Sequence, residues 1–420
     1  MQELTPAMQA QFDKLKSGIA QAFWMHGFQH IETPLIERTE VLLAKAGGDT
    51  EKQIYKVIKT DETADKANQA LRFDHTVPLA RYTVEHMNDL AFPFKVTQIA
   101  RNFRGERAQR GRFREFYQCD VDVVGRENLP VAYDAEVIAT LADAIRVLPV
   151  PEFVVRVSNR KLLGGMLEEL NLEHLAEKIF SVVDHAEKVP KEKTEMSLEE
   201  LGLGAENVVK ITTFIEMRGE RLEIIDKLRS FGFENEKFQA GIAELDEVLG
   251  LVEVLSPGTK VIADMLIVRG LDYYTGTVFE TAVPQYREFG SICSGGRYEN
   301  LAGYYTEQSL PGVGGSIGLT RLFAVLVEAE LVQASKQKPI DACVIPLSEH
   351  EIAEANRVAD NLRKTGWSVD VVLGDNKLSA KLKYASRVAR KAAVIGDDEL
   401  KSGKYKLRDF ESGVDAIQQI

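Results

Sequence analysis

Two strand-like segments joined by a long charged loop constrain the fold of this chain more than any other feature. Residues 94–104 and 113–124 carry the β-branched and aromatic residues typical of strands, and residues 105–111 between them are rich in charge. This spacing predicts an antiparallel hairpin with an unusually long tip.

Side chains alternate across a strand, so the second segment has two unlike faces. One face carries Phe113, Glu115, Tyr117, Cys119, Val121 and Val123, and the other carries Arg114, Phe116, Gln118, Asp120 and Asp122. The second set would be costly inside an apolar core, because its charged groups would lose their water. We therefore expect it to form the floor of a polar pocket.

Composition limits the class of protein. The 420 residues exceed one ordinary core, because a domain takes roughly 100–200 residues. With 45% hydrophobic and 28% charged residues, a disordered or fibrous chain is excluded. There is no uncharged apolar run of about 18 residues, so we expect no membrane span. Three scattered cysteines and an N-terminus without a secretion pattern predict a cytoplasmic protein with no disulfide framework.

The net charge of −12 argues against a nucleic-acid partner when taken over the whole chain. Net charge averages over surfaces that act separately, so local basic segments are more informative.

Changes in pattern along the chain predict an α+β protein with an insertion and a separate C-terminal domain. The expected parts are a catalytic domain in two pieces (1–160 and 258–331), a mostly helical insertion (161–257), a linker (332–338) and a small α/β domain (339–420). Helices are expected at 8–27, 76–85 and 319–331, a strand at 28–34, and a solvated loop at 188–200. In the last domain, strands are expected at 342–346, 368–373 and 392–395, with helices at 349–364 and 378–390.

The hairpin tip carries the densest basic segment. Residues 101–114 hold six arginines and one glutamate. Arginine suits phosphate because its rigid fork of N–H donors matches two oxygens at once. Phe116, on the same face as Arg114, has a ring on which a nucleobase could stack. The alternative is a solvated basic loop.

Two further segments carry candidate binding groups. Arg269 follows three apolar residues of a strand-like segment, where it needs a partner or a cleft; a structural ion pair with Asp272 is the alternative. Residues 294–298 and 312–318 are rich in glycine and precede Arg321, and glycine permits close backbone approach to a ligand. Neither common phosphate-loop spacing is present, so a strand-to-helix junction remains the alternative.

A basic helix is expected near the C-terminus. Residues 377–391 carry Lys377, Lys381, Lys383, Arg387, Arg390 and Lys391 without an acid. This segment is a candidate nucleic-acid surface, with Lys377, Lys381 and Arg387 as contacts; the alternative is a solvated helix. The seven histidines lack metal-ligand spacing, and we expect His75 and His86 at the surface or at a pocket edge.

Together these motifs resemble a known family. Residues 103–118 are similar to the second signature motif of class II aminoacyl-tRNA synthetases in its histidine-specific form. Residues 266–274 and 293–298 resemble two peptides peculiar to histidyl-tRNA synthetases, residues 314–321 resemble the third class II motif, and the segment around Pro34 resembles the first. The resemblance spans nearly the whole chain.

The resemblance implies an antiparallel class II catalytic sheet, a homodimer, and a C-terminal anticodon-binding domain. It implies ligation of L-histidine to tRNA(His) with ATP and Mg²⁺. Arg104 and Arg269 would be catalytic. The ATP-binding residues would be Arg104, Glu106, Arg112, Phe116 and Arg321. The histidine-binding residues would be Asp74, Thr76, Arg104, Gln118, Asp122, Arg269, Tyr273 and Tyr274. Arg107 and Gln109 would meet the tRNA acceptor end, and no protein side chain is assigned to a metal.

The sequence departs from the family pattern at three positions. Thr320 stands where an acid is common before the third-motif arginine, Ala108 replaces a usual proline, and Asp122 replaces a commoner glutamate. Two other functions are alternatives: a non-catalytic histidine-sensing regulatory subunit of a biosynthetic phosphoribosyltransferase, and a nucleic-acid sensor that forms no adenylate. The intact Arg104, Arg269 and Arg321 and the domain at 339–420 argue against the first of these.

Overall fold

The computed structural model describes residues 3–43, 51–61, 63, 68–107, 111–268, 273–299, 301–334, 338–374 and 376–419. Two compact units share the chain. The first consists mainly of residues 12–332 and the second mainly of residues 333–420. Each unit is considered by itself.

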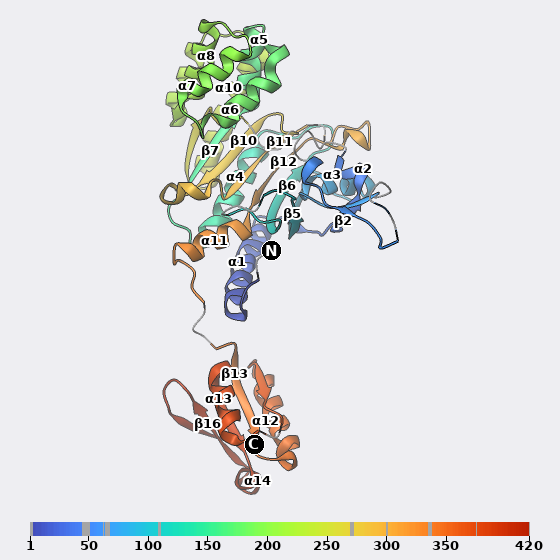
Figure 1. Cartoon of the computed structure of the whole chain (residues 1–420), viewed down its shortest axis with the longest axis vertical. Coiled ribbons are helices and arrows are strands. Elements are labelled where there is room, and N and C mark those ends of the chain that lie inside the picture. Colours follow the sequence, from blue (N-terminus) through green and yellow to red (C-terminus); the bar gives the residue numbers. More distant parts are fainter. Residues whose placement is uncertain are drawn as a thin grey trace. The chain divides into compact units, whose positions relative to one another are not determined.

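Nine strands of the described chain form one large sheet in the first unit (Figure 1). Their order is β1-β5-β6-β12-β11-β10-β7-β9-β8. The pairs β1/β5 and β7/β9 are parallel, and the other neighbours are antiparallel. The bounds are β1 Gln29–His30, β5 Phe94–Phe103, β6 Glu115–Val124, β7 Val154–Asn159, β8 Arg218–Gly219, β9 Lys260–Asp264, β10 Thr277–Ala282, β11 Cys293–Tyr298 and β12 Gly312–Ile317.

A small three-stranded sheet among the described residues, in the order β2-β4-β3, lies in the same unit. Its strands are β2 Ile36–Arg38, β3 Lys56–Val57 and β4 Gln69–Leu71. The helices of this unit are α1 Pro6–Met25, α2 Thr39–Leu43, α3 Thr76–Glu85, α4 Ala132–Arg146, α5 Arg160–Glu169, α6 Ala176–Ala186, α7 Lys191–Glu200, α8 Ala205–Ile215, α9 Arg221–Ser230, α10 Glu236–Leu255 and α11 Leu319–Glu328. Short 3₁₀ turns lie at η1 Glu51–Gln53, η3 Glu173–Leu175, η4 Pro284–Phe289 and η5 Ala302–Tyr304.

The second unit is built on a sheet in the order β14-β13-β15-β16-β17. The first three strands in this order are parallel, and β16 and β17 are added antiparallel. The elements are β13 Ile340–Pro346, η6 Glu349–Glu351, α12 Ile352–Lys364, β14 Val369–Val371, α13 Leu378–Val388, β15 Ala389–Ile395, α14 Asp397–Ser402, β16 Lys404–Asp409 and β17 Asp415–Gln419. The predicted α/β alternation is confirmed, and β16 and β17 were not predicted.

The two faces predicted for residues 113–124 are confirmed in β6. Val121 pairs with Gly315, and a Cβ on Gly315 would meet Leu141 of α4, so this face is covered by a helix. Asp122 pairs with Gly314, and a Cβ on Gly314 would meet the Asp122 carboxylate at 2.0 Å, so the polar residues occupy the opposite face. The core therefore lies between the sheet and α4, and the polar face is left for the site.

Several helices between β7 and β9 gather at one end of the large sheet. In Figure 1 helices α5 to α8 and α10, drawn in green, gather beyond β7 and β10. Helix α10 carries the contact, since it packs on α4, α5 and β7. None of the helices in the described part of the chain is long and apolar enough to cross a membrane.

Two local predictions were wrong. Residues 191–200 form α7 instead of a loop, because Thr194 and Leu198 are buried while its charged side chains face outward. Residues 28–34 give only the two-residue strand β1.

The glycine-rich residues 293–298 and 312–317 are strands of the large sheet, although glycine is a poor strand former. Strand β12 leads through Gly318 into α11, so the second segment forms the strand-to-helix junction that was the alternative to a ligand site.

The motif arginine Arg297 holds the scaffold together. Its Nε and Nη2 atoms donate to the Asp134 carboxylate at 2.7–3.0 Å, and its Nη1 donates to the Leu129 carbonyl at 3.1 Å. Asp134 is fully buried and Arg297 is 5% exposed. The pair therefore ties β11 to the start of α4.

We expect the Arg297→Met variant to lose about 3–5 kcal/mol of unfolding free energy, because it leaves a buried carboxylate without its partner. Adding Asp134→Leu should restore a large part of this loss. Arg357→Met, which breaks the exposed pair with Glu354, is the control and should cost less than about 1 kcal/mol. Urea unfolding measures all three, and equal losses for the two single variants would contradict this role.

Candidate active site

A cleft opens over the polar face of the large sheet. The space between its walls, together with the solvent at its mouth, amounts to about 580 Å³. Its lining residues come from β6, β11, β12, the hairpin tip and α11: Arg104, Glu106, Gly111, Arg112, Phe113, Phe116, Tyr117, Gln118, Ser291, Ile292, Cys293, Ser294, Ser316, Gly318 and Arg321. Segments far apart in the sequence thus meet in one cavity.

Positive charge concentrates at one part of the cleft. Arg321 donates from Nε to the Gly111 carbonyl and from Nη1 to the Ser291 carbonyl, both at 3.0 Å. Burial lowers the pKa of Arg321, and the positive charges of Arg112 and Arg104 lower it further. Cations held close enough to disfavour one another's charge make a site that favours an anion.

Two of the arginines are aimed by fixed partners. The Arg104 Nε donates to the Phe73 carbonyl at 3.1 Å, and its guanidinium carbon lies 5.1 Å from the centre of the Phe116 ring. The Arg112 Nη1 donates to Glu106 Oε2 at 2.9 Å. Within the described residues neither guanidinium has a further hydrogen-bond partner, so the remaining donors can meet a phosphate or a carboxylate.

A buried carboxylate lies beside Arg104. Asp74 Oδ1 accepts from the Val77 backbone N–H at 3.2 Å, and Asp74 Oδ2 accepts from the Tyr273 hydroxyl at 3.3 Å. Thr76 hydrogen-bonds the Tyr273 side chain. Burial raises the pKa of Asp74 to about 6, although the Val77 N–H and Arg104 oppose the rise. This carboxylate is poised to gain from a cationic ligand.

The polar face of β6 continues toward a second carboxylate. Gln118 accepts from Asn102 and donates to the Ser316 hydroxyl, each at 2.8 Å. Asp122 Oδ1 accepts from the Tyr298 hydroxyl at 3.0 Å, and burial, followed by the charge of Asp120, raises the pKa of Asp122 well above its usual range.

Glycines on β11 and β12 make room for these groups. A Cβ on Gly296 would meet the Tyr274 ring at 2.9 Å, and one on Gly314 would meet Asp122. Burial, followed by the charge of Asp122, raises the pKa of Tyr274 above its usual range, as expected for a phenol facing a carboxylate. Glycine is a poor strand former, but the pocket requires it at these positions because a side chain would collide with Tyr274 or Asp122.

Some predicted residues lie elsewhere. Arg269 and Gln109 fall outside the described residues, and Arg107 is exposed. Lys377 and Arg387 are exposed on the second unit. Lys381 was predicted as a surface contact, but it is 6% exposed and its Nζ donates to the Pro346 carbonyl at 2.9 Å, so it anchors α13 instead.

The family model of histidyl-tRNA synthetase matches residues 1–322, and an anticodon-binding domain model matches residues 341–418. The chain belongs to the histidyl-tRNA synthetase family. It is 42% identical to a histidine–tRNA ligase of Finegoldia magna over 98% of this chain and 94% of the relative. A histidine–tRNA ligase of Clostridium tetani is 41% identical over 98% of this chain and 93% of the relative.

Solved structures agree with the predicted fold class. A histidyl-tRNA synthetase from Nostoc sp. PCC 7120 matches with a TM-score of 0.85 and 36% identity, covering 100% of this chain and 95% of that chain. An ATP phosphoribosyltransferase regulatory subunit/histidyl-tRNA synthetase from Bacillus halodurans C has a TM-score of 0.77 and 22% identity, covering 94% of this chain and 97% of that chain, which shows a shared fold alone.

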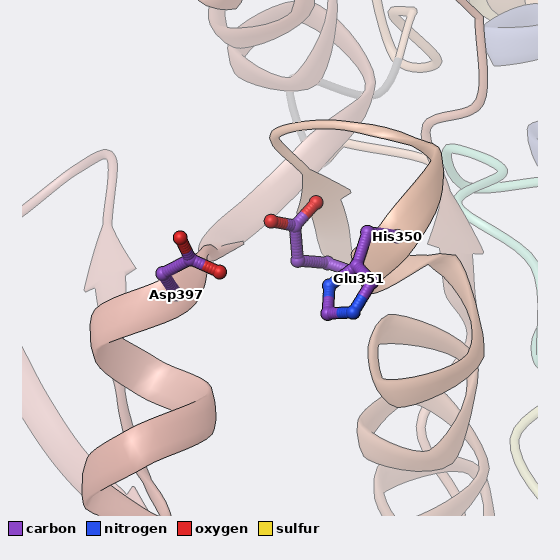
Figure 2. A group of neighbouring side chains, drawn as sticks. All are labelled: His350, Glu351 and Asp397. Carbon is purple, nitrogen blue, oxygen red and sulfur yellow. The ribbon is translucent and has the colours of Figure 1, made fainter.

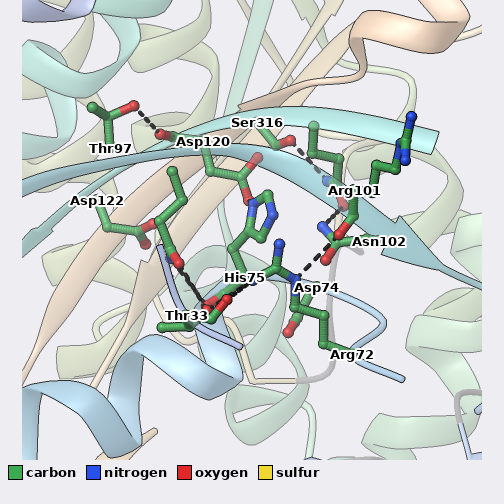
Figure 3. A network of polar contacts seen from close by, with 12 residues as sticks. Thr33, Arg72, Asp74, His75, Thr97, Arg101, Asn102, Asp120, Asp122 and Ser316 are labelled. Carbon is green, nitrogen blue, oxygen red and sulfur yellow. Dashed lines mark hydrogen bonds and ion pairs between the residues drawn. The ribbon is translucent and has the colours of Figure 1, made fainter. Parts of the chain in front are cut away.

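Sequence reasoning missed several residues that hold this synthetase site together (Figure 3). Arg72 is 1% exposed; it donates from Nε to the Arg101 carbonyl at 3.1 Å and from Nη1 to the Thr33 carbonyl at 2.5 Å. Tyr298 and Ser316 support Asp122 and Gln118. The prediction that His75 lies at a surface or pocket edge was wrong, since it is fully buried. The sequence signal that could have found Arg72 is its place directly after a short strand, where a charged side chain needs a partner.

One group of potential metal ligands lies in the second unit. The ligand atoms of His350, Glu351 and Asp397 lie within 4.8 Å of one another (Figure 2). Glu351 Oε2 already accepts from the backbone N–H and the hydroxyl of Ser348, and His350 and Asp397 are exposed. We assign no metal to this group.

The buried charge of Asp74 should be measurable as a pH-dependent cost. Its pKa of about 6 exceeds the ordinary 3.8, so the folded state binds the proton more tightly than the unfolded state. At about 1.4 kcal/mol per pKa unit, ionised Asp74 costs on the order of 3 kcal/mol above pH 6, and this cost fades as the pH falls toward 4.

We therefore expect the Asp74→Asn variant to be more stable than the ligand-free wild type at pH 8, with a gap that narrows below pH 6. Urea unfolding of both proteins from pH 8 to pH 5, followed by circular dichroism, measures the gap. A gap that does not change with pH would contradict the raised pKa.

Proposed function

We propose that the chain is a histidine–tRNA ligase. It activates L-histidine with ATP to histidyl-adenylate and pyrophosphate, and then transfers the histidyl group to the 3′ end of tRNA(His). The observation that carries this proposal is the meeting of Arg104, Arg112 and Arg321 in one cleft whose floor leads to the buried Asp74 and Asp122.

The first step needs no protein nucleophile. A carboxylate oxygen of histidine attacks the α-phosphorus of ATP, the bond to the bridging oxygen of pyrophosphate breaks, and negative charge develops on the phosphoryl oxygens. Arg104 would hold the α-phosphate and the histidine carboxylate together, while Arg112 and Arg321 would hold the other phosphates. Positioning and fixed positive charge then supply the catalysis.

The adenine ring would stack on Phe116, which lines the cleft beside Arg321. The role of Arg269 at the α-phosphoryl group rests on its motif alone.

The amino-acid end is read by the buried polar groups. Asp74, Thr76 and Gln118 would receive the ammonium group, and Asp122 with Tyr273 and Tyr274 would face the imidazole. A pocket built to hydrogen-bond its substrate rejects apolar analogues strongly, because its buried polar groups would be left without partners.

Magnesium fits this site as a partner of the nucleotide. Mg²⁺ is usually held by one or two carboxylates together with substrate phosphates, and Glu106 is a carboxylate that lines the cleft. When bound, the ion would neutralise charge on the phosphates. Glu106 meanwhile orients Arg112 through their hydrogen bond.

The partners of the second step are assigned by position. Arg107 is exposed on the hairpin tip and would, with Gln109, meet the tRNA acceptor end. Lys377 and Arg387 are exposed on the domain that matches the anticodon-binding model. A homodimer in the cytoplasm, with an insertion at 161–257, stays part of the proposal.

A non-catalytic regulatory subunit is not favoured. The relatives named histidine–tRNA ligase are 41–42% identical over 97–98% of the chain, and the anticodon-binding model matches residues 341–418. The arginines of the cleft that the structure describes are also retained.

The purified protein should exchange pyrophosphate into ATP only when L-histidine is present. Arg112→Ala should lower this exchange about 10²-fold, because it removes a donor aimed at phosphate. Arg101→Ala is the matched control: Arg101 lies on the same hairpin, has a similar exposure of 52% against 46%, and also pairs with a glutamate. It should change the rate less than about twofold. Folded protein without histidine-dependent exchange would refute the proposed function.

A further inference from the structure

His75 occupies an unusual place for a histidine. It stands between Asp74 and Thr76, directly before α3, and its side chain is completely buried. An imidazole is seldom so buried without a task, because it carries a donor and an acceptor that need partners.

The side chain of His75 faces Asp120 of β6. His75 Nδ1 lies 3.0 Å from Asp120 Oδ2, and Asp120 is 4% exposed (Figure 3). Apart from this ion-pair contact, the two ring nitrogens of His75 and the Oδ1 atom of Asp120 have no hydrogen-bond partner within the described chain. The two groups therefore depend on each other for compensation of their polarity.

Asp120 is also close to the carboxylates of the amino-acid pocket. It follows Gln118 and precedes Asp122 on the same face of β6. The negative charge of Asp120 raises the pKa of both Asp122 and Asp74, whereas His75 lowers the pKa of Asp74. Asp120 therefore belongs to the same strand face as the side chains that border the amino-acid pocket.

The described polar side chains near the pair, Arg72 and Gln98, have hydrogen-bond partners other than the His75 ring and the Asp120 carboxylate. Arg72, at the end of β4, is buried and feels the charge of Asp120, but its donors go to Thr33 and Arg101. Gln98 of β5 donates to the His75 backbone carbonyl, at 3.3 Å, and not to its ring. His75 is thus the group whose side chain directly faces Asp120 among the contacts described here.

We propose that His75 and Asp120 form a buried pair beneath the histidine pocket that fixes the start of α3 against β6 and so keeps Asp74 and Asp122 correctly placed for the substrate. His75 is a positioning residue: it acts through Asp120 and does not touch the substrate. The proposal rests on the proposed function and adds the residue pair that sets the affinity for L-histidine, while leaving the ATP end of the cleft unaffected.

If His75 has this role, its replacement should change the KM for L-histidine but not the KM for ATP. The His75→Leu variant leaves Asp120 buried without its partner, so the start of α3 is no longer held against β6, and Asp74 and Asp122 meet the ammonium and imidazole groups less well. The KM for L-histidine should rise at least about 10-fold, which corresponds to one decade in affinity, and the KM for ATP should stay within about twofold.

The decisive comparison uses His75→Leu, Asp120→Asn and the double variant in histidine-dependent pyrophosphate exchange. Asp120→Asn keeps the size of the side chain but removes the carboxylate that faces the His75 ring, so it should raise the KM for L-histidine about threefold or more. The double variant no longer holds an uncompensated carboxylate, so its KM for L-histidine should return toward that of the wild type from the value of His75→Leu. A residue that merely filled space would not give this recovery.

His26→Leu is the matched control, because His26 also pairs with an aspartate, with Nε2 3.2 Å from Asp143 Oδ2, and neither residue lines the cleft. It should leave both KM values unchanged. If His75→Leu does not fold, Asp120→Asn decides, and an unchanged KM for L-histidine would overturn the proposal.

The outcomes separate the two levels of the account. A wild type that shows histidine-dependent exchange, with variants whose KM values for both substrates rise together or not at all, would overturn the pair and leave the proposed function intact. A wild type without such exchange would overturn the proposed function and this proposal with it.

Discussion

The pairing of β6 between β5 and β12 is the constraint on which the cleft depends. This register sets Asp122 against Gly314 and Asp120 against Ser316, so alternate residues of one strand line the site while their neighbours pack on α4. A slip of one residue would turn the whole polar set into the core. The glycines of β12 belong to the same constraint, since a Cβ on Gly314 cannot coexist with the Asp122 carboxylate in its present position.

The site divides charge between its two ends. Arg104, Arg112 and Arg321 supply positive charge where phosphate is expected, and the charge of Arg321 is partly shielded from water by burial. At the other end the free protein holds carboxylates whose pKa values are raised by burial, with Asp74 at about 6. A cationic ligand stabilises a buried carboxylate of this kind more than it would stabilise an exposed one. Part of the binding energy of the substrate therefore offsets the free-energy cost of keeping a buried carboxylate ionised.

The sequence predicted those features that depend on local alternation or on a dense charge pattern. The faces of β6, helix α3 at residues 76–85 and the arginine-rich tip belong to this group. Features set by tertiary contacts were not predictable in the same way. Nothing local distinguishes Lys381, which donates to a backbone carbonyl from a buried position, from the exposed Lys377 four residues earlier, at the start of the same helix.

The same limit applies to pairs that are distant in the sequence. The partner of Arg297 is Asp134, and the partner of His75 is Asp120, so neither histidine nor arginine could be assigned a role before the strands were paired. The strands in the glycine-rich segments were hard to predict for a related reason. Glycine has a low strand propensity, but neighbouring side chains from other strands leave no room for a larger residue at these positions.

A crystal structure with L-histidine and a non-hydrolysable ATP analogue would show where both substrates bind. We expect the triphosphate in contact with Arg104, Arg112 and Arg321, the ammonium group near Asp74, and the imidazole near Asp122. A nucleotide bound away from these arginines, or an amino acid outside the pocket formed by Asp74 and Asp122, would contradict this expectation.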